Sequence, residues 1–287
     1  MFRPPGLGVL TDRTRLTVWG DPIAHSRSPQ LHAAAYGVLG LDWTYDRRRV
    51  AASEFSDALA SLDDGWRGLS VTFPLKAEAF SAARTLDRRA ELTGAVNTLL
   101  LEAPGPRGFN TDVGGITRSL QEHGLAEVPD ARIIGAGATA TSALVALSEL
   151  GARRVEVAAR RPEAVAPLID LGERLGVTVV AIPLAARAFT AVALSIATLP
   201  GDTALPEAVN ESLAASGGPL LDVVYGTWPT ALADAWQRTG GTAISGLGML
   251  LHQAVLQVRV FVSGDPNTEL TDERAVLAAM RSAVVGD

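Results

Sequence analysis

Short apolar runs alternate with segments of helical periodicity along the whole chain. Residues 16–19 (LTVW) predict a strand, and the segment from Pro29 to Gly40 predicts a helix. Proline suits the first turn of a helix, and glycine suits the residue that follows the last turn. The first predicted unit is therefore a strand, a loop and a helix.

The same alternation continues as far as residue 120. Trp43 and Tyr45 alternate with polar side chains, which predicts a strand with one solvated face, whereas Asn97 and Thr98 interrupt an apolar strand. A buried amide needs a hydrogen-bond partner, either in the protein or in a ligand. Strands are predicted at residues 43–50, at the beginning of the stretch 68–76 and at residues 95–101, and helices at residues 51–62 and, after Asp112, through residue 120.

From residue 131 onwards the pattern becomes a strand, a glycine turn and a long alanine-rich helix (ARIIGAGATATSALVALSEL). The last amphipathic segment carries Gln253 and Gln257 beside its apolar face, and Gln253 taken alone is interpreted as a surface glutamine. Further strands are predicted at residues 154–159, 177–182, 191–196 and 220–224, and this helix at residues 246–262.

This pattern predicts an α/β fold with two domains. We expect an amino-terminal α/β substrate-binding domain at residues 1–113, completed by returning carboxyl-terminal helices at residues 245–287. A Rossmann-type dinucleotide-binding domain is expected at residues 114–244. Such sheets bind ligands beyond the carboxyl ends of their strands, so we expect the site in a cleft between the domains, with hinge closure.

Composition and charge exclude several classes of function. The 287 residues are 47% hydrophobic and 20% charged, as in ordinary globular proteins. A net charge of −6 and an isoelectric point near 5.3 leave no basic stripe for nucleic acid. No apolar run approaches the roughly 20 residues that span a bilayer, and the amino terminus is poor material for a signal peptide. We therefore expect a cytoplasmic protein without a membrane partner.

The absence of cysteine excludes disulfides, thiol catalysis and cysteine metal sites. The histidines form no recognised metal motif, so no metal is expected, and His32 is predicted to be packed or at the surface rather than catalytic. Catalytic chemistry then falls mainly to Lys, Asp, Ser and Thr side chains. The sequence leaves the choice between a monomer and a homodimer open.

Two serines, Ser26 and Ser28, lie at the start of the first predicted helix. One interpretation is an N-cap with a neighbour. The other is that both hydroxyls bind a small polyhydroxylated or carboxylated ligand, because helix amino termini present exposed donors. The residue types alone leave both interpretations open.

The stretch GLSVTFPLK sets the hydroxyl of Thr72 and the ammonium of Lys76 just beyond an apolar strand, with Pro74 stiffening the turn between them. Asp112 precedes a predicted helix and, taken alone, is interpreted as its N-cap. These side chains are candidates for binding and proton transfer.

A glycine fingerprint, Gly135-x-Gly137-x-x-Ala140, lies between a predicted strand and a predicted helix. In that context it predicts a dinucleotide site, because the glycines allow a tight turn and close approach of a pyrophosphate. The next strand ends at Arg160 with no carboxylate at its tip, since Glu156 lies inside the strand. An arginine accommodates a 2′-phosphate, so NADP is favoured over NAD.

Placed side by side, these motifs resemble those of the shikimate dehydrogenase family. The resemblance covers nearly the whole chain and rests on seven motifs in the same order, DPIAHSRSP, SVTFPLK, GAVNT, GFNTD, GAGATAT, VVYGTWPT and GLGMLLHQA. It implies an NADP-dependent oxidoreductase that interconverts 3-dehydroshikimate and shikimate in aromatic amino-acid biosynthesis.

The resemblance also implies roles for single residues. Lys76 and Asp112 would be the catalytic pair, because reducing a ketone by hydride transfer needs a proton for the developing alkoxide. Ser26 and Ser28 would hold the substrate carboxylate. The other substrate contacts would be Thr72, Asn97, Asp112, Tyr225 and Gln253, and the dinucleotide contacts would be Gly135, Ala136, Gly137, Ala138, Thr139, Arg160, Thr198 and Gly246.

The chain departs from the family pattern at several positions. Ser70 stands where the family usually has Asn, and Ile196 stands where Asn is frequent before the Ala-Thr-x-Pro turn. The dinucleotide turn has Ala138-Thr139 where a glycine is frequent. The arginine expected at the 2′-phosphate is retained as Arg160, so the NADP prediction stands.

Two alternatives accompany this interpretation. A relative that oxidises quinate or an aminated analogue, often with NAD, is the nearest one, but Ser28 and Arg160 favour shikimate with NADP. A non-catalytic metabolite sensor is the other. A sensor would have lost Lys76 or Asp112 or gained a DNA-binding segment, and the sequence has neither feature.

Overall fold

The computed structural model describes residues 14–186, 188–226 and 228–285. The chain divides into two compact units, one holding the residues up to Thr111 and from Leu251 onwards, the other holding Asp112–Leu250. These limits differ by a few residues from those we expected. Thr227 and the amino-terminal segment considered as a signal peptide lie outside the described residues.

Unit 1 is built on a mixed sheet in which β1 pairs in parallel with both β2 and β3, and β5 is antiparallel to β3 and β6. The strand order is β2 (Thr44–Arg49), β1 (Arg15–Gly20), β3 (Trp66–Val71), β5 (Thr98–Leu100), β6 (Arg107–Phe109) and β4 (Thr85–Leu86). The predicted strands are all present. β4 and β6 were not predicted, because two or three residues are too few to give a periodic pattern.

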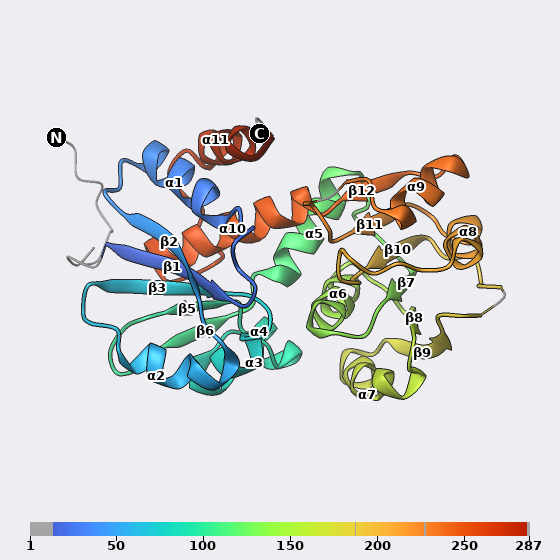
Figure 1. Ribbon diagram of the computed structural model, residues 1–287, viewed down its shortest axis with the longest axis horizontal. Coiled ribbons are helices and arrows are strands. Elements are labelled where there is room, and N and C mark those ends of the chain that lie inside the picture. Colours follow the sequence, from blue (N-terminus) through green and yellow to red (C-terminus); the bar gives the residue numbers. More distant parts are fainter. Residues whose placement is uncertain (1–13, 187, 227, 286–287) are drawn as a thin grey trace. The chain divides into compact units, whose positions relative to one another are not determined.

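Helices cover both faces of this sheet (Figure 1). Successive residues of a strand point to opposite faces, so Leu69 and Val71 of β3 enter a core with Trp19 and Phe55, whereas Ser70 faces α10. The helices of the unit are α1 (Ser28–Leu39), α2 (Phe55–Ala60) after the turn η1 (Ala52–Glu54), α3 (Lys76–Ala82), α4 (Arg88–Thr93), α10 (Leu247–Ser263) and α11 (Glu273–Val285).

The start and end of α1 agree with the sequence prediction. Pro29 lies in its first turn, and Gly40 closes the helix in the left-handed conformation at φ 64°. α10 begins and ends one residue later than the predicted segment 246–262, and it crosses the boundary between the two units. No helix among the described parts of the chain is long and apolar enough to span a bilayer.

Unit 2 contains a sheet whose six strands are all parallel. Their order is β12 (Ala243–Ser245), β11 (Leu220–Asp222), β10 (Leu194–Ala197), β7 (Asp130–Ile134), β8 (Arg154–Ala159) and β9 (Thr178–Pro183). This is the strand order of a doubly wound dinucleotide-binding sheet, in which the order reverses between β7 and β10. The α/β fold class predicted from the sequence is confirmed.

Four helices of unit 2 connect consecutive parallel strands, and a fifth, α5, precedes β7. They are α5 (Asp112–Glu122), α6 (Ala138–Glu149), α7 (Ala166–Leu175) after the turn η2 (Pro162–Val165), α8 (Glu207–Ala215) and α9 (Ala231–Arg238). The strand between Leu194 and Ala197 is almost fully buried, which explains why it reads in the sequence as a continuous apolar run.

Candidate active site

The loop that carries the two serines leads from β1 into α1. Arg27 occupies the N-cap position and makes no side-chain cap, so neither serine is the N-cap that one interpretation of the sequence required. Instead, the Ser26 hydroxyl accepts a hydrogen bond from the backbone N–H of Ser28 at 3.3 Å. Ser28 is buried, and Ser26 is half-buried.

Arginine side chains fix this serine loop at several points. Arg49 holds the Asp21 carboxylate with two hydrogen bonds of 2.9 and 3.0 Å, which lowers the pKa of Asp21. Arg47 donates to the carbonyl of Ala24 and, at 3.4 Å, to that of Ser26. Arg27 itself donates to the carbonyl of Val284 in α11 at 2.7 Å. The loop is therefore held in place by β2 and by the last helix.

Thr72 and Lys76 follow β3, as the sequence predicted. The Thr72 N–H donates to the carbonyl of Trp19 at 2.9 Å, and the Thr72 carbonyl accepts from Leu75 at 2.8 Å. Lys76 is the first residue of α3, and its carbonyl accepts the N–H of Val96 at 3.0 Å. Both side chains are half-buried. Main-chain bonds thus fix the turn at both ends.

Asn97 lies beside this turn, immediately before β5. Its backbone carbonyl accepts the N–H of Val71 at 2.8 Å, which places it next to Thr72. Its side-chain oxygen accepts the N–H of Thr111 at 2.9 Å, and its amide nitrogen donates to the Thr111 hydroxyl at 2.9 Å. The buried amide therefore has protein partners, and these determine its orientation.

Asp112 is the residue after Thr111 and the first residue of α5. It lies inside the first helical turn and is not the N-cap that its sequence context suggested. The helix dipole favours a carboxylate at this position. The Cα atom of Asp112 lies about 3.8 Å from that of Thr111, as across any trans peptide. Asn97 thus holds the chain within one residue of Asp112.

Two glutamines of α10 belong to the interior of the protein. Gln253 is only 8% exposed, so its interpretation as a surface residue was wrong. Gln257, one helical turn later, is 2% exposed and hydrogen-bonded to side chains of α1, β3 and β5. The sequence placed both beside the apolar face of the helix but assigned no role to Gln257.

The predicted dinucleotide turn has the geometry that its glycines require. Gly135 follows β7 with φ +116°, and a Cβ there would come within 2.6 Å of the Thr198 hydroxyl. α6 then begins after Gly137, and no side chain caps the N–H groups of its first turn. Such a helix start is suited to a pyrophosphate. Thr198 follows β10, and its N–H donates to Ile134 at 2.8 Å.

Other predicted residues of unit 2 lie at the carboxyl ends of its strands. Arg160 follows β8 directly and is exposed, whereas Tyr225 follows β11 and is half-buried. Gly246 is buried after β12, where a Cβ would meet the carbonyl oxygen of Val223 at 2.1 Å. A packing requirement therefore explains this glycine. Ile196 is wholly buried inside β10.

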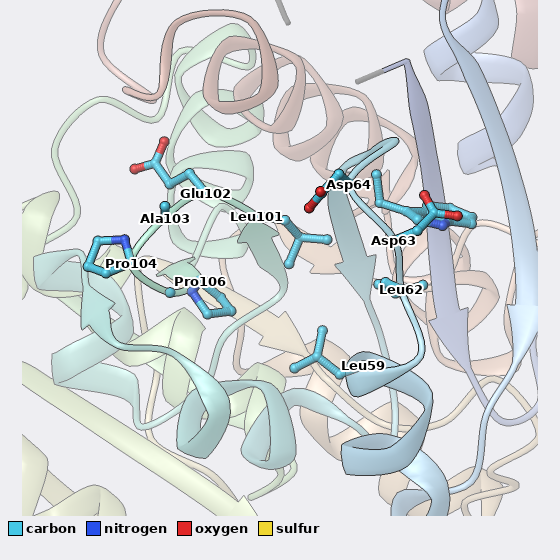
Figure 2. A pocket seen from close by; sticks show the side chains of 11 residues that line it. Leu59, Leu62, Asp63, Asp64, Leu101, Glu102, Ala103, Pro104 and Pro106 are labelled. Atoms are coloured by element: carbon cyan, nitrogen blue, oxygen red, sulfur yellow. The ribbon is translucent and has the colours of Figure 1, made fainter. Parts of the chain in front are cut away.

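Residues of unit 1 line a pocket of about 360 Å³ (Figure 2). Trp66, the first residue of β3, belongs to this lining, whereas Thr72 follows the last residue of β3, so about 20 Å of strand separates the pocket from Thr72. None of the predicted site residues lines it. Its lining residues are Leu59, Leu62, Asp63, Asp64, Trp66, Leu101, Glu102, Ala103, Pro104, Gly105 and Pro106.

One signal in the sequence bears on the catalytic candidate and was overlooked. Lys76 is the only lysine of the chain, while all other cations among its 25 Lys and Arg residues are arginines. Arginine does not release its proton in proteins, whereas lysine can do so. A chain that otherwise uses arginine throughout therefore places its one lysine side chain in the turn that follows β3, at the start of α3.

Comparison with known proteins agrees with the fold and the motifs. Residues 18–99 match the family model of the shikimate dehydrogenase substrate binding domain. A shikimate dehydrogenase (NADP(+)) from Methylobacterium radiotolerans is 41% identical over 251 residues, which covers 84% of this chain and 88% of the relative.

Solved structures give the same result. The structure of Mycobacterium tuberculosis shikimate dehydrogenase matches with a TM-score of 0.81 and 39% identity, over 94% of this chain and 99% of that one. The Thermus thermophilus enzyme in complex with NADP(H) and shikimate matches with a TM-score of 0.77 and 28% identity, over 94% and 99% of the two chains. The chain therefore belongs to the shikimate dehydrogenase family.

Proposed function

We propose that this protein is an NADP-dependent shikimate dehydrogenase, which interconverts 3-dehydroshikimate and shikimate by hydride transfer. Family membership supports this, as do curated relatives named as NADP(+) enzymes. The observation that carries the proposal is that main-chain hydrogen bonds hold Thr72, Lys76 and Asn97 together just beyond the end of β3. Shikimate offers hydroxyls and a carboxylate to such donors.

We assign the substrate contacts of unit 1 by the chemistry of each side chain. The hydroxyls of Ser26 and Ser28 at the start of α1 are suited to the substrate carboxylate, since the amino terminus of a helix favours an anion. Thr72, Asn97 and Gln253 would meet the ring hydroxyls. Tyr225 of unit 2 would contact the same substrate.

Lys76 is the proposed proton donor and acceptor. In the reducing direction its ammonium gives a proton to the alkoxide oxygen that forms as the ketone accepts hydride, and in the oxidising direction its amine takes that proton back. Asp112 would orient the ammonium through a charge-assisted hydrogen bond. Proton transfer of this kind typically contributes about 10²–10⁴ in rate.

Unit 2 is the proposed NADP domain, and unit 1 the proposed substrate domain. The tight turn at Gly135 and the start of α6, which has no side-chain cap, are suited to a pyrophosphate, and we assign exposed Arg160 to the 2′-phosphate. Ala136, Gly137, Ala138, Thr139, Thr198 and Gly246 complete the proposed contacts. When bound, NADP supplies or accepts the hydride.

The test of this function is a steady-state assay at the absorbance of the reduced nicotinamide, with shikimate and quinate and with NADP and NAD. We expect shikimate with NADP to be the preferred pair. NADP is expected because Arg160 follows β8 and no Asp or Glu stands at that end of the strand. A preference for quinate with NAD would contradict the proposal.

Substitution of Lys76 tests the proton-transfer role. We expect Lys76→Ala to lose about a hundredfold or more in kcat, with the KM for shikimate altered much less. Lys76→Arg is the matched control, because it keeps the cation but does not release its proton readily, so it should bind shikimate and remain slow. Near-normal turnover of Lys76→Ala would refute the assignment.

Because Lys76 is the sole lysine, its protonation can be followed directly. Reductive methylation with ¹³C-formaldehyde should give one lysine signal besides that of the amino terminus in the NMR spectrum. Shikimate should shift that signal if Lys76 touches the reacting hydroxyl. An unchanged signal at saturating shikimate would count against the role of Lys76 and leave the family assignment intact.

Further predictions concern the location, the assembly and the partners of the protein. We propose a cytoplasmic location and an assembly no larger than a homodimer, with no nucleic acid as partner. Cell fractionation and light scattering of the purified protein would test these points separately from the activity.

A further inference from the structure

Beside the proposed substrate residues, unit 1 contains a buried network of neutral side chains with Gln257 at its centre. The Gln257 carbonyl oxygen accepts hydrogen bonds from the Ser70 hydroxyl at 2.9 Å and from His32 Nε2 at 3.2 Å. Its amide nitrogen donates to the Thr98 hydroxyl at 3.1 Å and to the Asn97 carbonyl at 3.3 Å. All four hydrogen-bonding positions of the amide are therefore used.

Which groups donate and which accept in this network follows from one group that can only accept. The main-chain carbonyl of Asn97 can only accept, so the nitrogen of Gln257 must face it and the oxygen must face Ser70 and His32. Burial lowers the pKa of His32 to about 3, so the imidazole is neutral and carries one proton. That proton lies on Nε2, and Nδ1 accepts from the Tyr36 hydroxyl at 3.0 Å.

The orientation of the Gln257 amide also determines the hydrogen bonds of the Asn97 side chain. Since Thr98 accepts the N–H of Gln257, its own proton is free to point to the side-chain oxygen of Asn97, which lies 2.9 Å away. The Thr111 N–H donates to the same oxygen. The oxygen of Asn97 is thus turned inward, and its amide nitrogen is turned towards the Thr111 hydroxyl. A reversed Thr98 hydroxyl would remove one of the bonds that select this orientation.

We propose that Gln257 is a positioning residue for substrate binding, which fixes the side-chain amide of Asn97 from the interior of unit 1. The proposal rests on the proposed function, in which Asn97 meets a ring hydroxyl. Gln257 follows Gln253 by one turn on α10, so one helix carries a proposed substrate contact and the group that orders another. Gln257 itself is not assigned any contact with substrate.

The first variant to test is Gln257→Met, which keeps the approximate volume and removes all four hydrogen bonds. We expect the KM for shikimate to rise roughly tenfold, as for the loss of about one net hydrogen bond to a neutral group, with the KM for NADP unchanged and kcat within about threefold. The matched control is Gln237→Met on the exposed side of α9, which should leave every constant unchanged.

The second variant, Gln257→Glu, keeps a polar side chain at the centre of the network. It retains the acceptor for Ser70 and His32 but replaces the NH2 group that faces Thr98 and Asn97 by an oxygen that carries at most one proton. The Thr98 hydroxyl then has to turn away from Asn97. We expect a folded protein by circular dichroism whose KM for shikimate rises as it does in Gln257→Met.

A double-mutant cycle separates positioning from a merely structural role. Asn97→Ala should raise the KM for shikimate, and adding Gln257→Met to it should raise that KM no further. Additive effects, or a normal KM in both Gln257 variants while Asn97→Ala is impaired, would overturn the inference alone. A normal KM in Asn97→Ala would overturn both the inference and the proposed role of Asn97.

Discussion

The two units offer different parts of the chain to their proposed ligands. Unit 1 offers side chains, such as Thr72 and Asn97, and the orientation of Asn97 is set by the buried groups around it. Unit 2 offers mainly backbone, at the turn of Gly135 and the start of α6. Binding by unit 1 should therefore respond to changes of hydrogen-bonding groups, whereas binding by unit 2 should respond to an added Cβ at a few positions.

The buried polar groups of the two units differ in the same way. Those around Gln257 are neutral, whereas unit 2 buries an ion pair between Arg132 of β7 and Glu156 of β8 at 2.9 Å. Burial alone would raise the pKa of Glu156, but hydrogen bonds from Arg132 and Arg154 lower it. The pair joins the central strands in register and lies inside them, so its expected role is stability rather than binding.

The largest expected effect concerns this ion pair. Arg132→Met would leave Glu156 buried without its main partner, so we expect the free energy of unfolding in urea to fall by about 3–5 kcal/mol. The double variant Arg132→Met/Glu156→Leu should recover much of the loss. The KM values of the folded fraction should not change. A raised KM for NADP at normal stability would assign the pair to binding.

Gly135→Ala tests the backbone site of unit 2. The residue has φ +116°, and the new Cβ would clash with the Thr198 hydroxyl, so strain of about 1–3 kcal/mol should raise the KM for NADP roughly 5- to 150-fold. Binding of shikimate alone, measured by calorimetry, should remain normal. Gly151→Ala is the control, since it has a similar strain at φ +85° but lies outside the fingerprint. It should lower stability without changing the KM for NADP.

Arg160→Ala tests the side chain of unit 2 that is expected to determine the preference for NADP over NAD. Loss of a charge-assisted contact with a 2′-phosphate should raise the KM for NADP about tenfold and leave that for NAD unchanged. Arg161→Ala, at the neighbouring exposed arginine, is the matched control and should keep the preference for NADP. Equal losses with both cofactors would show that Arg160 acts on stability or on the adenine side.

The smallest expected effect concerns the neutral network of unit 1. His32 is surrounded by Tyr36, Tyr45, Gln257 and Phe261, none of which carries a charge below pH 7. Its pKa is lowered from 6.5 to about 3, chiefly by burial, so from about pH 6 downwards the unfolded chain binds a proton that the native protein does not.

Stability should therefore fall as the pH falls through that range. The slope approaches about 1.4 kcal/mol per pH unit between pH 6 and pH 5, above the range in which the carboxylates titrate. Urea unfolding at several pH values measures it. A His32→Gln variant should have a shallower dependence on pH than the parent, and an identical slope would contradict the argument.

Much of the fold could be predicted because its signals are local. The strand that ends before Thr72, the helix between Pro29 and Gly40, and the fingerprint at Gly135 all depend on residues within a few positions of each other. The identity of the site residues came from motifs of the same kind. Their assignment to substrate and cofactor came from the family resemblance, and it stays a prediction for each residue.

What could not be predicted involves residues far apart in sequence. A helical pattern places Gln257 beside an apolar face but does not say which strand covers it, and its partner Ser70 lies 187 residues away. The same reason explains why Gln253 was assigned to the surface and why Asn97 was left with an unnamed partner that proved to be Thr111.

By itself, the sequence determined many of the helices and strands, the dinucleotide turn and the position of the only lysine, because propensity, periodicity and backbone geometry are properties of neighbouring residues. Only the tertiary structure decided the strand orders and the partners of the buried amides. A polar group buried by distant elements must find its hydrogen bonds among whatever they bring, and that is decided only when the chain has folded.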